Sequence, residues 1–186
     1  MKILPGSKKG WLRLAFVWGF VFLVIAIYGC RITAMPGTSY TGELPPLTPM
    51  QTQVQENLRQ HVRELAGGIG VRHALVSDTL EQAADYVDTQ LQSHGYSPTY
   101  QVYEVEGATV RNIIVEVPGT TRPNEVIVVG AHYDSAVNSP GADDNASGVA
   151  AVLEMARIYK SLRTERTVRF VAFSNEEPSY FQTDDM

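Results

Sequence analysis

The sequence predicts an α/β protein in which helices and a sheet form layers, a helix-sheet-helix arrangement preceded by one transmembrane helix. Between residues 51 and 173, segments with apolar residues at helical spacing alternate with short runs of β-branched residues. That alternation is typical of a layered α/β domain. Ahead of it, residues 14–30 form an apolar run without a charge. Hydrophobic residues make up 44% of the 186 residues, which is enough for one folded domain with a core.

The first part of the chain has the features of a membrane anchor. Trp11 and Arg13 extend the apolar run towards the amino end, so that the segment covers residues 11–30. A helix that spans a bilayer needs roughly 20 apolar residues. Lysines precede the segment, which predicts a cytoplasmic tail over residues 1–10 and an exported remainder. We therefore expect a single-pass membrane protein whose folded domain lies on the periplasmic or extracellular side.

Two alternatives stay open for this apolar segment. A cleaved secretory signal peptide has a similar position and composition. The only cysteine, Cys30, ends a stretch that resembles a bacterial lipoprotein cleavage box, although Tyr28 is bulky where a small residue is usual. In each case the rest of the chain is exported. One cysteine provides no disulfide framework, so the fold depends on its core or on a metal.

Charge and composition separate the anchor from the folded domain. Residues 31–50 contain several prolines and glycines and are predicted to be an extended linker. Beyond residue 31 the chain has ten basic and twenty acidic residues and no basic patch. This balance argues against a nucleic acid as partner.

The folded domain, residues 51–186, is expected to contain three helices and four strands. Apolar residues at helical spacing predict helices over residues 51–65, 80–95 and 147–162. Asp78 and Glu81 have the form of a capping box before the second helix. β-Branched or apolar runs predict strands over residues 99–105, 112–117, 125–130 and 167–173. Because residues 126–129 are all apolar, we expect that strand to be covered on both faces.

Metal-binding side chains follow two of these strands directly. His132 and Asp134 come after the strand at 125–130, and Glu176 and Glu177 come after the strand at 167–173. In open α/β sheets, sites gather at the carboxyl ends of strands. If the two strands are neighbours, the four side chains meet at one edge of the sheet. A histidine with several carboxylates is the ligand set of a hydrolytic zinc site.

A glycine-flanked loop, Gly-Ala-Asp-Asp-Asn-Ala-Ser-Gly at residues 141–148, adds two carboxylates. Glycines let a backbone turn sharply and approach a metal. A carboxylate can bridge two zinc ions about 3.5–4 Å apart. A histidine and an aspartate two residues apart can serve as ligand and orienting group. Of two adjacent glutamates, one can bind metal while the other accepts a proton from metal-bound water.

Three motifs in this order resemble the family twenty-eight zinc metallopeptidases. They are Gly-Ala-His-Tyr-Asp-Ser at residues 130–135, the loop at residues 141–148 and Asn-Glu-Glu at residues 175–177. The family includes bacterial aminopeptidases with paired zinc ions, and the resemblance covers about residues 75–186. It implies a zinc exopeptidase fold and two zinc ions in a complete site.

The resemblance also implies a role for each motif residue. His132 is a ligand of one zinc ion, and Asp134 orients its imidazole. Asp144 bridges both ions and precedes a cis peptide bond. Glu177 is a ligand of the other ion, and Glu176 is the general base.

Other interpretations remain for single residues of the motifs. Asp143 is an alternative to Asp144 as the ligand, although the resemblance, through the spacing to the Ser-Gly pair that ends the loop, favours Asp144. Asp134 alone is also typical of a residue that caps a turn. The glutamate pair alone is also typical of a solvated strand end.

The resemblance implies an aminopeptidase that acts on the amino termini of peptides or proteins. Two further ligands in the family, an aspartate and a histidine, lie well beyond the glutamate pair, and only residues 178–186 follow it here. We therefore expect an amino-terminal fragment or truncated form, in which the carboxyl-terminal part of the fold is missing. Glutaminyl cyclases, which resemble the family and use one zinc for acyl transfer, are the alternative. An inactive, membrane-tethered remnant is the third interpretation.

Three further histidines, and two aromatic residues that follow the third motif, also need an interpretation. We expect His61, His73 and His94 to be surface or packing residues, because a histidine without converging partners is rarely a ligand. Tyr180 and Phe181 either line a substrate pocket or belong to the core.

Overall fold

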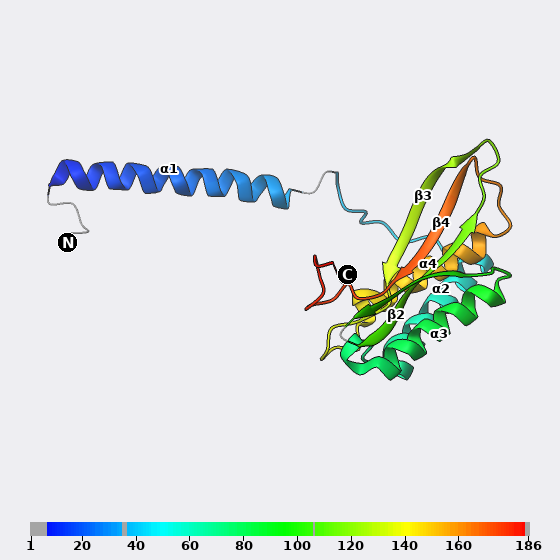
Figure 1. Ribbon diagram of the computed structural model, residues 1–186. Helices are drawn as coiled ribbons and strands as arrows, with labels where there is room; N and C mark the ends of the chain where they lie inside the picture. The colour runs from blue at the N-terminus through cyan, green and yellow to red at the C-terminus, as the bar shows by residue number, and fades with distance from the viewer. Residues whose placement is uncertain (1–6, 35–36, 106, 185–186) are drawn as a thin grey trace. The chain divides into compact units, whose positions relative to one another are not determined.

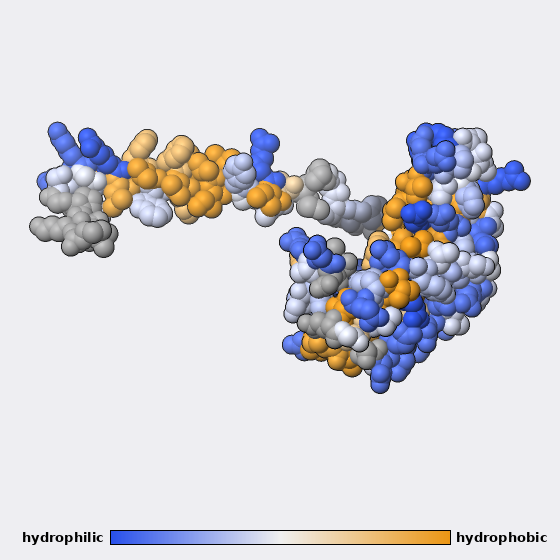
Figure 2. Space-filling view, viewed as in Figure 1, coloured by the Kyte–Doolittle hydropathy of each residue, from blue (hydrophilic) through white to orange (hydrophobic). Residues whose placement is uncertain are grey.

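The computed structural model describes residues 7–34, 37–105 and 107–184, and the chain divides into two compact units, Met1–Pro45 and Pro46–Met186 (Figure 1). The first unit contains helix α1, Lys8–Thr33, which begins where the Ser7 side chain accepts a hydrogen bond from the Gly10 N–H. None of its side chains is buried, and Figure 2 shows apolar residues covering most of its length. By length and composition α1 is able to cross a membrane, and a signal sequence has the same properties. It contains the segment predicted from the sequence.

The second unit begins with a helix that is capped at its first turn. Helix α2, Pro49–Val62, has Thr48 as its N-cap, and Thr48 and Gln51 form a capping box. A π-helical segment, Arg63–Ile69, continues it as far as Gly70, whose φ of 89° suits glycine. The predicted helix, residues 51–65, therefore begins two residues too late, and the predicted linker, residues 31–50, extends two residues too far.

Helix α3, Ser77–Ser93, follows a short 3-10 turn at Ala74–Val76. The prediction of a capping box at Asp78 is wrong, because Val76 is the N-cap residue and no side chain caps the helix. Asp78 lies in the first turn instead, where a negative charge favours the helix dipole.

The strands form one four-stranded sheet in the order β1-β2-β4-β3. The strands are β1 Thr99–Val105, β2 Ala108–Val117, β3 Arg122–His132 and β4 Arg166–Phe173. β2 pairs antiparallel with β1 and β4, whereas β3 and β4 are parallel. Helix α4, Ser147–Tyr159, connects β3 to β4. The parallel pair brings the carboxyl ends of β3 and β4 to the same edge.

Helices α3 and α4 pack on the same face of the sheet. Arg111 of β2 pairs with Glu81 and Asp85 of α3, and Phe170 of β4 packs edge-on against Tyr159 of α4. Both sheet residues point to the face that also carries Ile113, which is fully buried. α2 packs on α4. The described residues thus form one helical layer and one sheet. The second helical layer of the expected helix-sheet-helix arrangement is not among the described residues.

The prediction that the strand at 126–129 is covered on both faces is wrong. Val126, Ile127 and Val128 are 43%, 47% and 55% exposed, because β3 is an edge strand of the described sheet and only its last residues are buried. The apolar run indicates a strand suited to burial, but the cover that a strand receives depends on its neighbours.

Candidate metal centre

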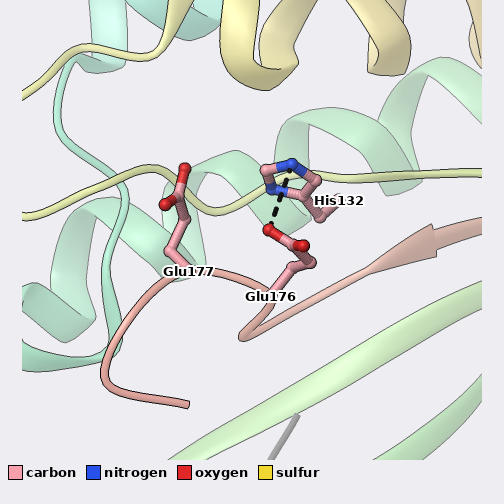
Figure 3. A group of neighbouring side chains, drawn as sticks. All are labelled: His132, Glu176 and Glu177. Atoms are coloured by element: carbon pink, nitrogen blue, oxygen red, sulfur yellow. Dashed lines mark ion pairs between the residues drawn. The ribbon is translucent and has the colours of Figure 1, made fainter. Parts of the chain in front are cut away.

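The histidine of the first motif and the glutamates of the third lie at the shared carboxyl edge of β3 and β4. His132 is the last residue of β3 and pairs with Phe173, the last residue of β4. Glu176 and Glu177 follow in the loop after β4. One nitrogen of His132 and one oxygen from each glutamate lie within 4.8 Å of one another (Figure 3).

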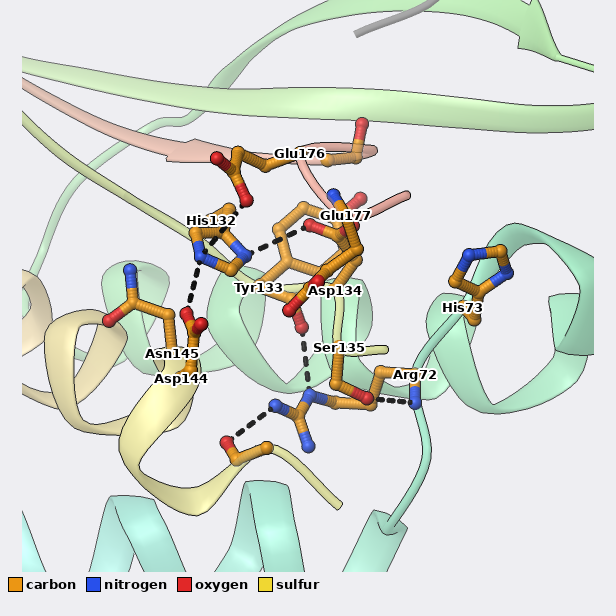
Figure 4. A network of polar contacts seen from close by, with 12 residues as sticks. Arg72, His73, His132, Tyr133, Asp134, Ser135, Asp144, Asn145, Glu176 and Glu177 are labelled. Atoms are coloured by element: carbon orange, nitrogen blue, oxygen red, sulfur yellow. Dashed lines mark hydrogen bonds and ion pairs between the residues drawn. The ribbon is translucent and has the colours of Figure 1, made fainter. Parts of the chain in front are cut away.

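Three carboxylates contact the two nitrogens of His132 (Figure 4). Nε2 lies 3.0 Å from Asp144 Oδ1 and 3.5 Å from Glu176 Oε2. Nδ1 lies 3.3 Å from Asp134 Oδ1. The imidazole is therefore held between an aspartate behind it and two carboxylates in front of it. That is the arrangement expected of a metal ligand with an orienting carboxylate.

Asp134 is buried and connects two motifs. It is 1% exposed, and its Oδ2 accepts a hydrogen bond from the Glu177 N–H at 3.0 Å. Its other oxygen, Oδ1, faces His132 Nδ1 at 3.3 Å in an ion-pair contact. Asp134 therefore does more than cap a turn, because it holds the histidine and the glutamate loop together.

Asp144 reaches the histidine from an irregular segment between β3 and α4. The segment Ala142–Ala146 departs from helical geometry at Asp144 and Asn145, and the peptide bond between them is cis, as expected. Asn145 Oδ1 accepts the Gly148 N–H at 3.0 Å. A Cβ atom at Gly148 would collide with that amide oxygen, so the glycine is needed for the close approach.

The two adjacent aspartates of this loop are placed differently. Asp144 contacts His132, and its side chain is 77% exposed on the solvent side. For Asp143 the observed hydrogen bond runs from the Ser147 hydroxyl to its backbone carbonyl. The geometry therefore favours Asp144 over Asp143 as the ligand.

The charges at the centre perturb two side chains. Burial lowers the pKa of His132, but the carboxylates of Asp134, Glu176 and Asp144 outweigh this effect and raise the pKa to about 8. Burial raises the pKa of Glu177, and the nearby charges of Asp144 and Asp134 raise it further. Like charges collected around one histidine are costly unless a cation accompanies them.

The donor set fits a zinc ion. It offers one imidazole nitrogen and oxygens from Glu176 and Glu177 in one cluster, with Asp144 in contact with the same imidazole. Nitrogen and carboxylate oxygen are ligands that zinc accepts in hydrolytic sites. A divalent cation would also remove the repulsion that raises the pKa of Glu177.

Sequence reasoning missed the residues that hold the glutamate loop. Asn112 of β2 is buried, and its Oδ1 accepts the Ser174 N–H at 2.9 Å. Tyr103 of β1 also contacts Ser174, through hydrogen bonds at 3.0 and 3.1 Å. Asn175 then takes a positive φ of 61°, which redirects the chain towards Glu176. Asn112 lies 62 positions before Ser174, and no local sequence pattern connects them.

A cavity of about 510 Å³ opens beside the glutamate that contacts His132. Its lining combines residues of the His132 cluster, amide side chains and apolar residues. The lining residues are Gln101, Asn112, Gly130, Ala131, His132, Asn145, Phe173, Ser174 and Glu176. A molecule in this cavity would touch Glu176 directly.

The other three histidines, and the two aromatic residues after the third motif, do not line this cavity. His61 and His73 are buried and His94 is half-buried, each outside the His132 cluster. Tyr180 is buried and stacks on His73, so it belongs to the core. Phe181 is 49% exposed and does not line the cavity.

Comparison with known proteins identifies the family. Residues 112–182, which contain all five motif residues, match the model of peptidase family M28. The chain is 35% identical over 182 residues to the uncharacterized protein YfbL of Escherichia coli, and the match covers 92% of the chain and 52% of YfbL. It is 46% identical over 70 residues to the aminopeptidase YwaD of Bacillus subtilis, which covers 37% of the chain and 15% of YwaD.

Solved structures share the fold of about two thirds of this chain. A zinc aminopeptidase from Bacillus subtilis matches with a TM-score of 0.61 at 15% identity, over 66% of the chain and 62% of that protein. A glutaminyl cyclase from Porphyromonas gingivalis matches with a TM-score of 0.52 at 25% identity, over 66% of the chain and 44% of the cyclase. The chain spans about half the length of YfbL, 52%.

Proposed function

We propose that this chain carries the zinc-binding and water-activating residues of an M28 exopeptidase, an aminopeptidase that removes residues from the amino termini of peptides or proteins. The observation that carries the proposal is the convergence of His132, Glu176 and Glu177 within 4.8 Å at the carboxyl ends of two parallel strands. The names of the aminopeptidase relatives support the reaction class.

In this proposal each motif residue has a separate task. His132 and Glu177 hold zinc, and Asp134 fixes the imidazole from behind through the 3.3 Å contact with Nδ1. Asp144, whose Oδ1 contacts His132 Nε2 at 3.0 Å, would be the ligand shared with a second ion. Bound zinc would polarise the scissile carbonyl and lower the pKa of a water molecule.

Glu176 has the position of the general base. Its carboxylate borders the cavity and lies 3.5 Å from His132 Nε2. It would accept a proton from the attacking water and deliver that proton to the leaving amine. Its side chain is 36% exposed, so water and the leaving group can both reach it.

Two variants test this division of labour. Glu176→Gln should retain zinc and lose at least 100-fold in the turnover of an aminoacyl chromogenic substrate, a typical loss for a missing general base. Glu177→Gln should lose zinc affinity as well as turnover. Glu104→Gln, at an exposed glutamate of β1, is the matched control and should behave as wild type. Wild-type turnover in Glu176→Gln would refute the assignment.

Glutaminyl cyclase activity is a second candidate, because cyclase structures share the fold at 25% identity. The two candidates differ in the metal they need. Two zinc ions per protein by elemental analysis would favour the peptidase. One ion, together with cyclisation of an amino-terminal glutamine, would favour the cyclase.

We also propose that α1 anchors the protein, with the amino terminus in the cytoplasm and the M28 unit outside. The lysines before α1 and its exposed apolar surface support this topology. Protease added to intact cells should digest the M28 unit and spare the amino terminus. Protection of the whole chain would refute the orientation, and a soluble product starting after residue 30 would show cleavage instead.

A further inference from the structure

Arg72 is buried beneath the metal centre, although no motif contains it. It is the largest fully buried side chain among the described residues. Its guanidinium donates hydrogen bonds to five backbone carbonyls. The acceptors are Tyr133 O at 2.8 Å, Leu65 O at 2.9 Å, Gly70 O and Pro140 O at 2.7 Å, and Gly141 O at 3.1 Å. A buried cation is costly, so this number of bonds indicates a specific task.

Three of the five carbonyls that Arg72 binds, those of Tyr133, Pro140 and Gly141, belong to the connection that follows His132 and presents Asp134 and Asp144. Tyr133 lies between His132 and Asp134, and Gly141 precedes Asp144 by three residues. The backbone adds two bonds, because the Arg72 N–H donates to Ser135 Oγ at 2.9 Å and the Ser135 N–H donates to Arg72 O at 2.6 Å. One side chain thus holds together the beginning and the middle of the single connection between β3 and α4 (Figure 4).

The next residue, His73, reaches the third loop. It is 1% exposed, and its Nε2 lies 3.1 Å from Pro178 O, directly after Glu177. Nδ1 accepts the Leu75 N–H at 3.1 Å, so Nε2 carries the proton and donates to Pro178. The ring also stacks on Tyr180 with centroids 5.5 Å apart. Arg72 therefore contacts the first two motif segments, and His73 contacts the residue that directly follows the third.

We propose that Arg72, assisted by His73, is a positioning residue that holds the metal-binding loops at the separation zinc requires. The inference rests on the proposed function. Without the hydrogen bonds of Arg72 and His73, repulsion between the carboxylates around His132 would move the loops that carry them apart. Groups behind metal ligands commonly change metal affinity 10–100-fold when they are removed.

Arginine suits this task better than lysine. Its planar guanidinium directs five N–H groups at fixed angles, and here they donate to the connection between β3 and α4 and to the segment before Arg72. A lysine would keep the charge but place its donors on a single nitrogen. Gly141 completes the fit, because its φ is 54° and a Cβ there would lie 2.6 Å from Ser135 Cβ and 3.1 Å from Arg72 Nη2.

The experiment measures zinc affinity by competition with a chromogenic chelator, at a temperature where circular dichroism shows every variant folded. Arg72→Lys should bind zinc 10–100-fold more weakly than wild type. Ser135→Ala, which removes one hydroxyl, should weaken binding several-fold and serves if Arg72→Lys does not fold. Leu153→Ala is the matched control. It truncates a fully buried leucine of α4 and should lower the melting temperature while leaving zinc affinity unchanged.

Each outcome decides a separate point. If wild type binds zinc and both Arg72→Lys and Ser135→Ala bind it equally well, the positioning role is refuted and the proposed function stands. If Leu153→Ala weakens zinc binding as much as Arg72→Lys, the effect is general destabilisation, and the positioning role is again refuted. If wild type binds no zinc, the proposed function fails and this inference fails with it.

Discussion

Asp134 accepts the backbone N–H of Glu177 at 3.0 Å, across 43 positions of sequence. The same carboxylate faces His132 Nδ1 at 3.3 Å. A single buried side chain therefore aligns a residue after β3 with a residue after β4. The mutual placement of the two proposed ligands depends on this contact.

Asp134→Asn should separate the two tasks of this carboxylate. Its remaining carbonyl oxygen can still accept the Glu177 N–H, but the negative charge opposite His132 is lost. We expect zinc affinity to fall about 10–100-fold with a small change in melting temperature, measured by chelator competition and calorimetry. Asp134→Ala should lose both affinity and stability. Unchanged zinc affinity in both variants would contradict the orienting role.

The adjacent aspartates of the loop at 141–148 provide an internal comparison. Asp144→Asn should weaken zinc binding, because its carboxylate contacts His132 at 3.0 Å. Asp143→Asn should bind zinc within about two-fold of wild type, since only its backbone is engaged by Ser147. Isothermal titration with zinc compares the two. A larger effect of Asp143→Asn would exchange their assignments.

Zinc should stabilise the folded chain against heat. A ligand that binds only the native state contributes about 2.7 kcal/mol at a free concentration of 100 times its Kd, which is a rise of roughly 5–10 °C for a domain of this size. Scanning calorimetry with zinc and then with excess chelator measures the effect. His132→Asn should abolish the rise, and a rise that survives in this variant would place the binding elsewhere.

Acid should destabilise the packing of α2 through His61. This side chain is buried, with Nδ1 2.7 Å from the Tyr86 hydroxyl. Burial lowers its pKa below 6.5, against the smaller opposing effect of Glu154. The unfolded chain therefore binds more protons, so stability is fully present above pH 6.5 and falls as the pH drops towards the folded pKa.

The melting temperature between pH 8 and pH 5 measures this effect. His61→Gln should show a shallower decline than wild type. The pKa of His94 is also lowered by burial, so the double variant His61→Gln/His94→Gln should be flatter still. Parallel curves for wild type and His61→Gln would contradict the assignment.

The existence and approximate bounds of the helices and strands followed from local patterns, whereas the order of the strands in the sheet did not. Periodicity predicted α2, α3, α4 and the four strands within a few residues, because apolar spacing directly reflects which face of an element is buried. The boundaries shifted where capping decided them, as at Thr48 and Val76. The exposed state of Val126–Val128 was not predictable, since it depends on which strands lie beside β3.

The sequence by itself determined the chemistry available to this protein. His132, Asp134 and the two glutamates are recognisable from residue type and from their position after apolar runs. The choice of Asp144, and the cis peptide bond after it, were expected from the resemblance to the metallopeptidase family. These signals are local, because each motif lies within a single loop or at the end of a single strand.

Only the tertiary structure decided which side chains hold that chemistry in place. Arg72, His73 and Asn112 reach the motif loops from 61 to 105 positions away. Their contacts form when the segment before α3 packs beneath β3 and when β2 pairs with β4. A hydrogen bond from a side chain to a distant backbone carbonyl leaves no periodic pattern in the sequence, so the fold alone reveals it.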